Sequence, residues 1–236
     1  MIHIKQKLKE FKSIMNTITN LGIETNLTFM PTGIFVRIVN SSNIAMIVTT
    51  IKSSLFEKYE VEQEKTYTMD NIALMKCINK IGKNELDMDI LPTGIVFSNE
   101  KNDKLLLNYY VGQKDERRIP IVQNGITWEV NPGTLINELG EAVEFGNIGI
   151  FSGSDKLLLG IKSALINGNI NLDAKKLMGN ECKSYYNMGE FIYISMIRHI
   201  FDKVKFSYNE DLCCVEGVSP DIDFKWILAA RVDNDD

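Results

Sequence analysis

The sequence has few cysteines, the residues that cross-link many small proteins. It contains four cysteines, Cys77, Cys182, Cys213 and Cys214, and no pair has the Cys-x-x-Cys spacing. This pattern argues against both a disulfide framework and a zinc site. Cys213 and Cys214 are neighbours in an expected strand and point to opposite faces, so a bond between them would be strained.

Long apolar runs are also absent. No segment approaches the roughly 18 apolar residues that a membrane span needs. The segment that follows Met1 has no apolar signal core. We therefore expect an intracellular protein with no membrane partner.

Positive charge is in short supply. Lys and Arg number 26 against 31 Asp and Glu, which gives a formal net charge of -5 and a pI of about 5.2. Such a balance excludes a global basic field, so any contact with DNA has to be local. The 236 residues and the hydrophobic content of 44% suffice for a sizeable core, in one large or two smaller domains.

Signatures of catalysis are missing as well. The two histidines, His3 and His199, fall in an expected strand and an expected helix, and no Ser-His-Asp, HExxH or phosphate-cradling glycine pattern is present. Asp87 and Asp89 point to the same side of a strand, which suits a metal ion or, as we favour, a solvated strand face. We predict a protein that is not an enzyme and that binds neither a metal nor a cofactor.

What the sequence does have is internal repetition. Met30-Pro31-Thr32-Gly33-Ile34 is echoed about sixty residues later by Leu91-Pro92-Thr93-Gly94-Ile95. Proline presets the backbone for a turn and glycine accepts a positive φ, so each stretch predicts the tip of a β-hairpin. The recurring unit is a helix followed by a strand meander.

Helical periodicity recurs at four places. It predicts helices over Lys7–Leu21 and Met69–Ile81, with Ile72, Met75 and Ile78 in the second apolar stripe. A third helix begins at Asn131-Pro132, and a fourth covers Met188–Phe201. Alternation and turn residues predict strands at Ile2–Lys5, Thr25–Phe29, Gly33–Val39, Ile44–Ile51, Lys58–Tyr67, Glu85–Ile90, Gly94–Ser98, Lys104–Val111, Ile126–Val130, Gly149–Ser152, Lys156–Ile161, Asn169–Leu172, Cys182–Tyr186, Lys205–Tyr208, Leu212–Glu216 and Asp223–Val232.

A charged segment interrupts the strand pattern. Gly112 to Arg118 contains no apolar residue, and we interpret residues 112–124 as a linker between an N-terminal domain, 1–111, and a C-terminal domain, 125–236. The predicted fold class is α+β, with two similar halves that each contain two helix-plus-meander units. The polar faces of the first two helices carry lysines, whereas the third carries Glu138, Glu141 and Glu144.

This order of elements resembles the sliding clamp family of proliferating cell nuclear antigen (PCNA), in particular its archaeal members. Three stretches carry the likeness: Val39 to Met46, Arg118-Ile119-Pro120, and Trp226 to Arg231. The resemblance covers nearly the whole chain. It implies a DNA clamp fold with helices inside and antiparallel sheets outside.

In that family the helices line a ring around double-stranded DNA. The resemblance therefore implies sequence-independent phosphate contacts by lysine and arginine side chains, in place of the solvated helix face that such a stripe otherwise indicates. The candidates are Lys9, Lys12, Lys76, Lys80, Lys83, Arg198 and Lys203. The acidic third helix departs from this pattern.

The resemblance also implies a pocket beneath the linker that takes a peptide from a DNA polymerase or another replication or repair partner. The residues matched to this pocket are Val39, Ile44, Met46, Ile119, Pro120, Cys213, Ala229 and Ala230. For any one of them taken alone, ordinary core is the better interpretation. Ala230 stands where the family has proline.

The function implied is that of a sliding clamp, or polymerase processivity factor, that acts inside the cell with the DNA, is placed there by a clamp loader, and associates into a homotrimeric or heterotrimeric ring. Two alternatives stay open: a monomeric accessory protein that binds DNA on one basic face, and a peptide-binding regulatory module without DNA contact. Ring assembly would pair edge strands, for which Lys104–Val111 and the stretch around Lys175–Tyr186 are the candidates.

Overall fold

The computed structural model describes residues 1–113, 115–162 and 166–231. The chain divides into two compact units. Unit 1 contains 1–41, 47–117 and 219–224; unit 2 contains 42–46, 118–218 and 225–236, of which the last five residues lie outside the described part. Each unit therefore includes a short segment from the opposite half of the chain. The division into domains at 111 and 125 stays a prediction.

Unit 1 contains two helix-plus-meander modules. The first consists of β1 (Ile2–Ile4), α1 (Leu8–Thr19), β2 (Glu24–Met30), β3 (Gly33–Val39), β4 (Ala45–Lys52), the short 3₁₀ turn η1 (Ser53–Leu55) and β5 (Lys58–Tyr59). The second consists of β6 (Lys65–Asp70), α2 (Asn71–Ile81), β7 (Leu86–Leu91), β8 (Gly94–Ser98), β9 (Lys104–Asn108) and β10 (Tyr110–Val111). The strands form one sheet in the order β5-β1-β7-β8-β9 and another that runs β10-β6-β2-β3-β4.

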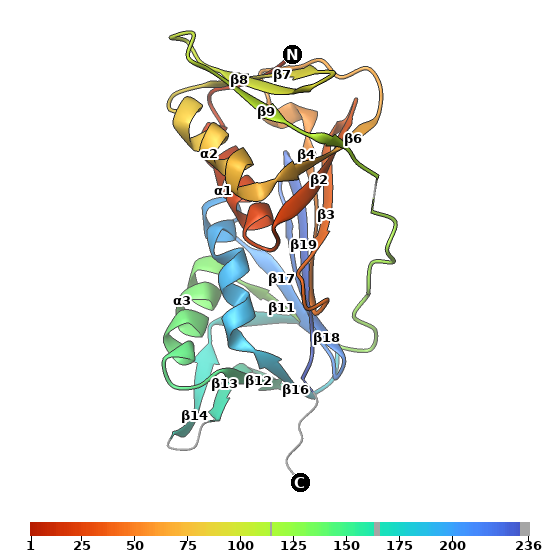
Figure 1. Cartoon of the computed structure of the whole chain (residues 1–236). Helices are drawn as coiled ribbons and strands as arrows, with labels where there is room; N and C mark the ends of the chain where they lie inside the picture. Colours follow the sequence, from red (N-terminus) through yellow and green to blue (C-terminus); the bar gives the residue numbers. More distant parts are fainter. Residues whose placement is uncertain (114, 163–165, 232–236) are drawn as a thin grey trace. The chain divides into compact units, whose positions relative to one another are not determined.

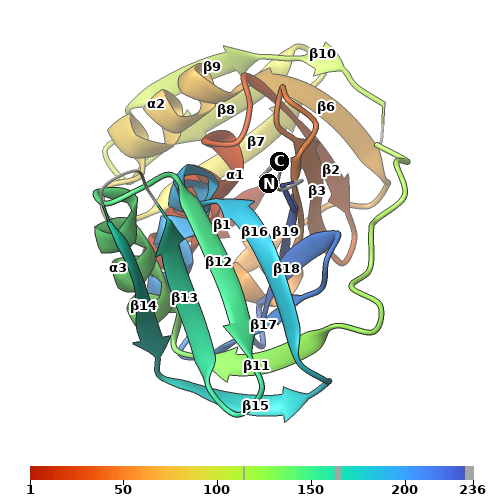
Figure 2. The ribbon, with the colours of Figure 1, turned by 90° about the horizontal axis from the view of Figure 1, so that it is seen from below.

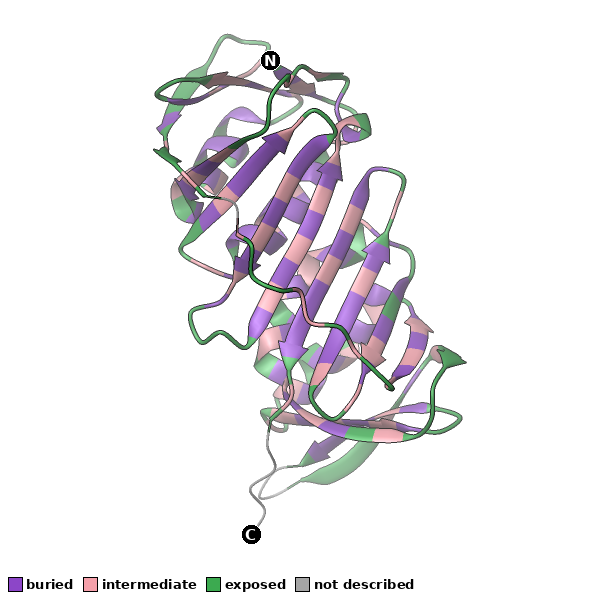
Figure 3. Ribbon diagram, turned by 90° about the vertical axis from the view of Figure 1, so that its right-hand side faces the viewer, coloured by how far each residue is buried: buried purple, intermediate pink, exposed green. Residues whose placement is uncertain are grey.

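Both predicted hairpins of unit 1 are confirmed. β2 pairs with β3 up to Met30 opposite Gly33, and β7 pairs with β8 up to Leu91 opposite Gly94. Gly33 has a φ of +143°, and a Cβ there would lie 2.1 Å from the carbonyl oxygen of Ile51. The turn therefore requires glycine. Figure 3 shows the alternation of buried and partly exposed residues along the strands that hydrophobic patterning predicts.

Helices α1 and α2 lie side by side in unit 1 (Figure 1). Their buried stripes follow helical spacing, with Phe11, Ile14 and Ile18 in α1 and Leu74 and Ile78 in α2. Asp70 caps α2, because its side chain accepts the Ala73 N–H at 2.7 Å. The placement of Ile72 in the apolar stripe of α2 was wrong, since its side chain is 65% exposed.

Two predicted strands of unit 1 are each split in two. The range Lys58–Tyr67 is interrupted at the acidic stretch between Tyr59 and Lys65, where Glu60, Glu62 and Glu64 would repel one another along an edge. The range Lys104–Val111 breaks at Tyr109, whose ring stacks on Tyr67 with centroids 3.9 Å apart. Before this break β9 pairs with β8, and beyond it β10 pairs with β6.

Unit 2 repeats the plan. One module consists of β11 (Ile126–Val130), α3 (Pro132–Val143), β12 (Ile148–Gly153), β13 (Leu157–Lys162), β14 (Asn167–Leu172) and β15 (Ala174–Met178). The other consists of β16 (Cys182–Asn187), η2 (Met188–His199), β17 (Val204–Tyr208), β18 (Leu212–Val218) and β19 (Ile222–Ala229), the first residues of which belong to unit 1. One sheet has the order β14-β13-β12-β16, whose strands lie side by side in Figure 2, and the other runs β19-β18-β17-β11-β15.

Alternation does not predict β15, although most of it falls in the stretch around Lys175–Tyr186 that we name as a candidate edge strand. Its five residues include two lysines and are partly or fully exposed, so they carry no apolar alternation. Pairing with β11 alone makes this segment a strand. A tertiary partner therefore overrides the local pattern.

The fourth helix is present but is a 3₁₀ helix throughout. Its buried side chains, Met188, Phe191, Ile194 and Ile197, recur at every third residue. A spacing of three matches the three residues per turn of a 3₁₀ helix, so one straight apolar edge faces the core. Phe191 packs edge-on against Trp226 with ring centroids 4.7 Å apart.

The segment 219–224 is held firmly within unit 1. Lys7 Nζ lies 2.5 Å from Asp221 Oδ2 across 214 positions of sequence. The backbone N–H of Lys52 donates to Asp221 O at 2.8 Å, and Thr49 Oγ1 donates to Asp223 O at 2.8 Å.

Among the described helices, none is long and apolar enough to span a membrane.

The Lys7–Asp221 pair predicts a pH-dependent stability. Burial acts to raise the pKa of Asp221, but hydrogen bonds from Lys7 and Ser54 outweigh it and hold the pKa below its usual value. A carboxyl group with a lowered pKa stabilises the fold above its unfolded pKa, and that contribution is lost as the pH falls through the folded pKa. Because Lys7 is partly exposed, solvent screens the pair, and Asp221→Asn should lower the free energy of unfolding by about 1 kcal/mol at neutral pH.

Urea unfolding of wild type and Asp221→Asn at several pH values measures this effect. The two proteins should differ at pH 7 and converge in acid, below the pKa of a free aspartate. A difference that is constant from neutral to acid pH would show that the pair contributes nothing to the pH dependence.

Candidate nucleic-acid interface and partner pocket

A shallow groove of about 570 Å³ runs between α1 and α2 of unit 1. Polar side chains from both helices line it, including Asn16, Asn20, Lys76, Asn79 and Lys80. In α1, Lys9 and Lys12 precede Asn16 and Asn20 at helical spacing, so the four residues form one stripe along the helix. The groove therefore gathers cationic and amide donors and contains no acidic lining residue.

The five predicted lysines of unit 1 differ in exposure. Lys9, Lys76, Lys80 and Lys83 are exposed, whereas Lys12 is half-buried. Burial lowers the pKa of Lys12 because it disfavours the charged ammonium group. The exposed four are the ones free to meet phosphate oxygens without rearrangement.

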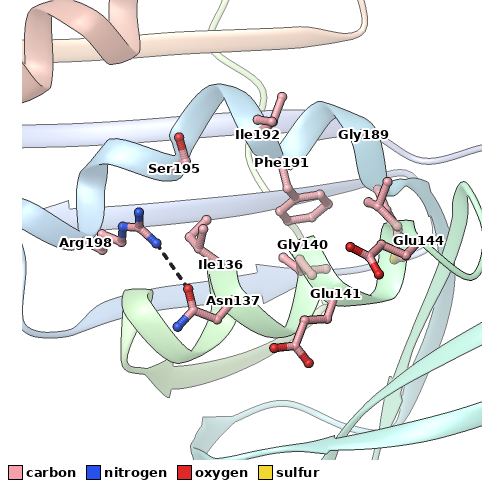
Figure 4. Close-up of a pocket in the computed structure, with 13 residues that line it drawn as sticks. Ile136, Asn137, Gly140, Glu141, Glu144, Gly189, Phe191, Ile192, Ser195 and Arg198 are labelled. Atoms are coloured by element: carbon pink, nitrogen blue, oxygen red, sulfur yellow. Dashed lines mark hydrogen bonds between the residues drawn. The ribbon is translucent and has the colours of Figure 1, made fainter.

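Unit 2 has the corresponding groove between α3 and η2, of about 410 Å³ (Figure 4). The charge of this groove differs from that of the groove between α1 and α2. Glu141 of α3 and Glu144, at the C-cap of α3, line it, and Arg198 of η2 donates a hydrogen bond from Nη1 to Asn137 Oδ1 at 3.1 Å. Glu138 is half-buried and does not line this groove. A phosphate would meet two carboxylates here for each guanidinium.

Lys203, the other basic candidate of unit 2, lies outside the lining of this groove. Its Nζ is 2.6 Å from Glu129 Oε1. The hydrogen bond from Lys203 lowers the pKa of Glu129. Of the two basic residues predicted in this half, the structure brings only Arg198 to the groove.

The predicted peptide pocket is assigned almost entirely to unit 2. Val39 belongs to unit 1, and the other seven residues belong to unit 2. Ile44 and Ala229 come together, because the Ala229 N–H donates to Ile44 O at 2.8 Å. Ala230 N–H donates to Asp211 O at 2.8 Å.

These pocket candidates differ in accessibility. Ile44 and Ala229 are exposed, and Met46, Ile119, Pro120 and Ala230 are partly exposed. Cys213 is fully buried in β18, and burial raises its pKa well above the usual value for a thiol. In this structure Cys213 therefore belongs to the core beneath any such pocket.

Asp87 and Asp89 are the pair of carboxylates that the sequence analysis considered as a metal site. Asp87 Oδ1 lies 2.7 Å from His3 Nδ1, and Asp89 is half-buried in β7. No group of three or more potential metal ligands occurs in the part of the chain that the structure describes.

Comparison with known proteins places residues 3–118 in the family "Proliferating cell nuclear antigen, N-terminal domain". Residues 3–118 are thus similar to the N-terminal domain of PCNA. Curated relatives include a "DNA polymerase sliding clamp" of Thermococcus onnurineus, 35% identical over 77 residues, and "DNA polymerase sliding clamp 1" of Thermococcus kodakarensis, 36% identical over 75 residues. These matches cover 33% and 32% of this chain, and the chain spans only 30% of the length of either relative.

Solved structures extend the likeness of the fold to both units. A PCNA2–PCNA3 complex of Sulfolobus tokodaii matches with a TM-score of 0.86 at 17% identity and covers 98% of both chains. PCNA of Entamoeba histolytica matches with a TM-score of 0.86 at 16% identity, over 98% of this chain and 99% of the other. The chain therefore has the PCNA fold over 98% of its length, which confirms the predicted fold class.

An arginine fixes the start of the segment predicted as a linker. Arg37 of β3 donates from Nη1 to Asp115 O at 2.8 Å and also to Arg117 O. Asp115 and Arg117 form an ion pair with each other, and the hydrogen bond from Arg117 lowers the pKa of Asp115. Gln113 O accepts from Asn26 Nδ2 at 3.1 Å.

The sequence analysis missed Arg37. Its partners lie about eighty positions away and are backbone carbonyls, which cannot be identified from the residue types in the sequence. The only signal was a single arginine among the apolar residues of an expected strand. A planar guanidinium with five donors suits two neighbouring carbonyls, which a lysine could not bridge in the same fixed geometry.

We predict that Arg37→Ala loosens residues 115–117. Hydrogen–deuterium exchange of peptides from this segment should accelerate by about tenfold or more, since the two carbonyls lose their shared donor. Arg118→Ala removes an exposed arginine from the same segment and is the matched control. Equal exchange in wild type and Arg37→Ala would show that these contacts do not hold the segment in solution.

Proposed function

We propose that the chain is a DNA sliding clamp, a non-catalytic processivity factor that holds duplex DNA and tethers a DNA polymerase and other peptide-bearing partners. The groove between α1 and α2 carries the proposal, since two helices present lysine and amide donors there and no carboxylate. Such donors contact phosphates without reading bases, which suits a protein that moves along DNA. The names of the Thermococcus relatives agree with this function.

Tethering explains how a protein without chemistry of its own raises processivity. A polymerase held on the clamp rebinds its template before it diffuses away, because the local concentration of the template is high. The proposal includes a trimeric ring, a clamp loader that opens it, and action inside the cell with the DNA.

The acidic groove of unit 2 gives weight to the runner-up, a peptide-binding regulatory module without DNA contact. Glu141 and Glu144 line the surface that corresponds to the basic groove of unit 1. In that case the unit 1 lysines would be an ordinary solvated face. Removing the unit 1 lysines distinguishes between the two candidate functions.

We predict that Lys9→Ala with Lys76→Ala weakens DNA binding. The slope of log affinity against log salt should fall by roughly two, about one for each lost phosphate contact. Titration of fluorescent duplex DNA at several salt concentrations measures this slope. Lys65→Ala with Lys205→Ala, which removes two exposed strand lysines, is the control. Identical slopes for all three proteins would favour the regulatory module.

The partner pocket gives a second test. Ile44→Asp places a charge on an exposed apolar position, while the Ile44 carbonyl keeps its bond to Ala229. We expect the affinity for a polymerase C-terminal peptide to fall by about tenfold or more, because a desolvated carboxylate replaces an apolar contact. Met46→Asp should act alike, and Val218→Asp, at another exposed apolar position of unit 2, should leave the affinity unchanged. Undiminished affinity in both pocket variants would remove the pocket assignment.

A further inference from the structure

The groove between α3 and η2 of unit 2 is lined mainly by apolar side chains. Four of its lining residues recur at every third position of η2, so one edge of the 3₁₀ helix faces the groove: Gly189, Ile192, Ser195 and Arg198. Ile192 on this edge is 68% exposed. The apolar side chains of the lining are Ile136, Leu139, Val143, Met188, Phe191 and Ile192. An open apolar groove of about 410 Å³ indicates a ligand with apolar groups of its own.

Gly140 leaves space in the middle of this groove. It lies inside α3, where a glycine destabilises the helix relative to an alanine. Packing does not require glycine at this position, because a Cβ there would meet no atom of the described residues within 4 Å. A residue that breaks a local rule without a gain for the fold is a candidate for a functional role. Here the missing side chain keeps the groove open.

Two glutamates stand at the end of α3 where they stabilise the helix least. Glu141 lies in the last turn and Glu144 is the C-cap residue, and the helix dipole presents partial negative charge at this end. The last turn has no basic residue that would offset them. Both glutamates are exposed and line the groove. Their carboxylates weaken the helix but suit a cation bound in the groove.

The charge of the groove is uneven along its length. Arg198 is bonded to Asn137 at one end, whereas Glu144 lies toward the other end (Figure 4). The groove between α1 and α2 is instead lined by Lys76 and Lys80 and has no acidic lining residue. One chain therefore has two helix-pair grooves of different charge, and only the one in unit 2 combines carboxylates with a mainly apolar lining.

We propose that the groove between α3 and η2 binds a basic segment of a protein partner, in which a pair of apolar residues is followed by lysines or arginines. The apolar pair packs over Gly140 and against Ile192, and the basic residues pair with Glu141 and Glu144. The inference goes beyond the proposed function, because it requires neither DNA nor a second copy of the chain. It also concerns a different surface from the predicted pocket, since none of the eight pocket candidates lines this groove.

Charge and apolar lining together select this ligand. A simple cation would use the carboxylates but not the apolar side chains. A peptide without basic residues would use the apolar side chains but not the carboxylates. Duplex DNA would bring phosphates, which the two carboxylates repel. A segment with both an apolar pair and basic residues uses the whole groove.

The test is titration of the full chain against a fluorescein-labelled peptide in which a Phe-Leu pair is followed by four lysines, with both ends blocked, measured by fluorescence anisotropy. In about 0.05 M salt, Gly140→Leu should lower the affinity by about tenfold or more, because its side chain occupies the groove. Glu141→Gln with Glu144→Gln should lower it by about tenfold, and by less in about 0.5 M salt, where exposed charges are screened.

The matched control is Glu181→Gln with Glu210→Gln, which removes two exposed glutamates of unit 2 from outside the lining and should leave the affinity unchanged. Replacing the lysines of the peptide by glutamates should abolish binding, and replacing Phe-Leu by Ser-Ser should lower the affinity by about tenfold or more. Thermal unfolding checks the fold of each variant. Gly140→Leu should unfold at or above the wild-type temperature, because leucine favours a helix more than glycine does.

Undiminished affinity in folded Gly140→Leu and in the glutamine pair overturns the site, and so does a wild type that fails to bind the lysine peptide at about 1 mM. Equal affinity for the Ser-Ser peptide would assign the groove to simple cations, and equal affinity for the glutamate peptide would leave only an apolar groove, so either result overturns the inference. The DNA titrations with Lys9→Ala and Lys76→Ala measure the clamp function separately. Loss of this site would therefore leave the clamp function standing, and failure of DNA binding would leave the site intact.

Discussion

The fold depends on satisfying backbone hydrogen bonds at the edges of its sheets. Strands that end a sheet present unpaired N–H and C=O groups, and each must find a strand, a side chain or water. Unit 1 uses the segment 219–224, which bonds to Lys52 and Thr49, and unit 2 uses the segment 42–46, which bonds to Ala229. Strands β9 and β14 each end a sheet and have a neighbouring strand on one side only.

The helices show how one architecture acquires two surface chemistries. In both units a pair of helices packs its apolar stripe on the sheets and leaves a groove outward. The buried stripe is constrained by packing, but the outer residues are not, so they vary without cost to the fold. Unit 1 presents lysines there and unit 2 presents glutamates, so the two grooves differ in charge.

The linker shows a different kind of control. A segment rich in charge and poor in apolar residues would be expected to move freely, yet Arg37 bonds two of its carbonyls and the Asp115–Arg117 pair stiffens it locally. A linker that is fixed at one end can still move at the other. Ile119 and Pro120, which we propose as part of the peptide pocket, follow directly in the chain.

The sequence by itself determined the repeated modules, the hairpins and the charge of each helix. These follow from local rules: a spacing of 3.6 or 2 selects the buried face, Pro-Thr-Gly forces a turn, and Asn131 and Asp70 cap helices through their own side chains. The spacing of Met188, Phe191, Ile194 and Ile197 also matches the 3₁₀ form of η2, although we expected an ordinary helix there.

Only the tertiary structure decided what depends on distant partners. It made β15 a strand, split Lys104–Val111 at the ring of Tyr109, buried Cys213, and joined Lys7 to Asp221 and Arg37 to the linker. The physical reason is the same in each case. A hydrogen bond or a ring contact between residues tens to hundreds of positions apart leaves no periodic signal in either stretch, because each partner is specified only when the fold brings them together.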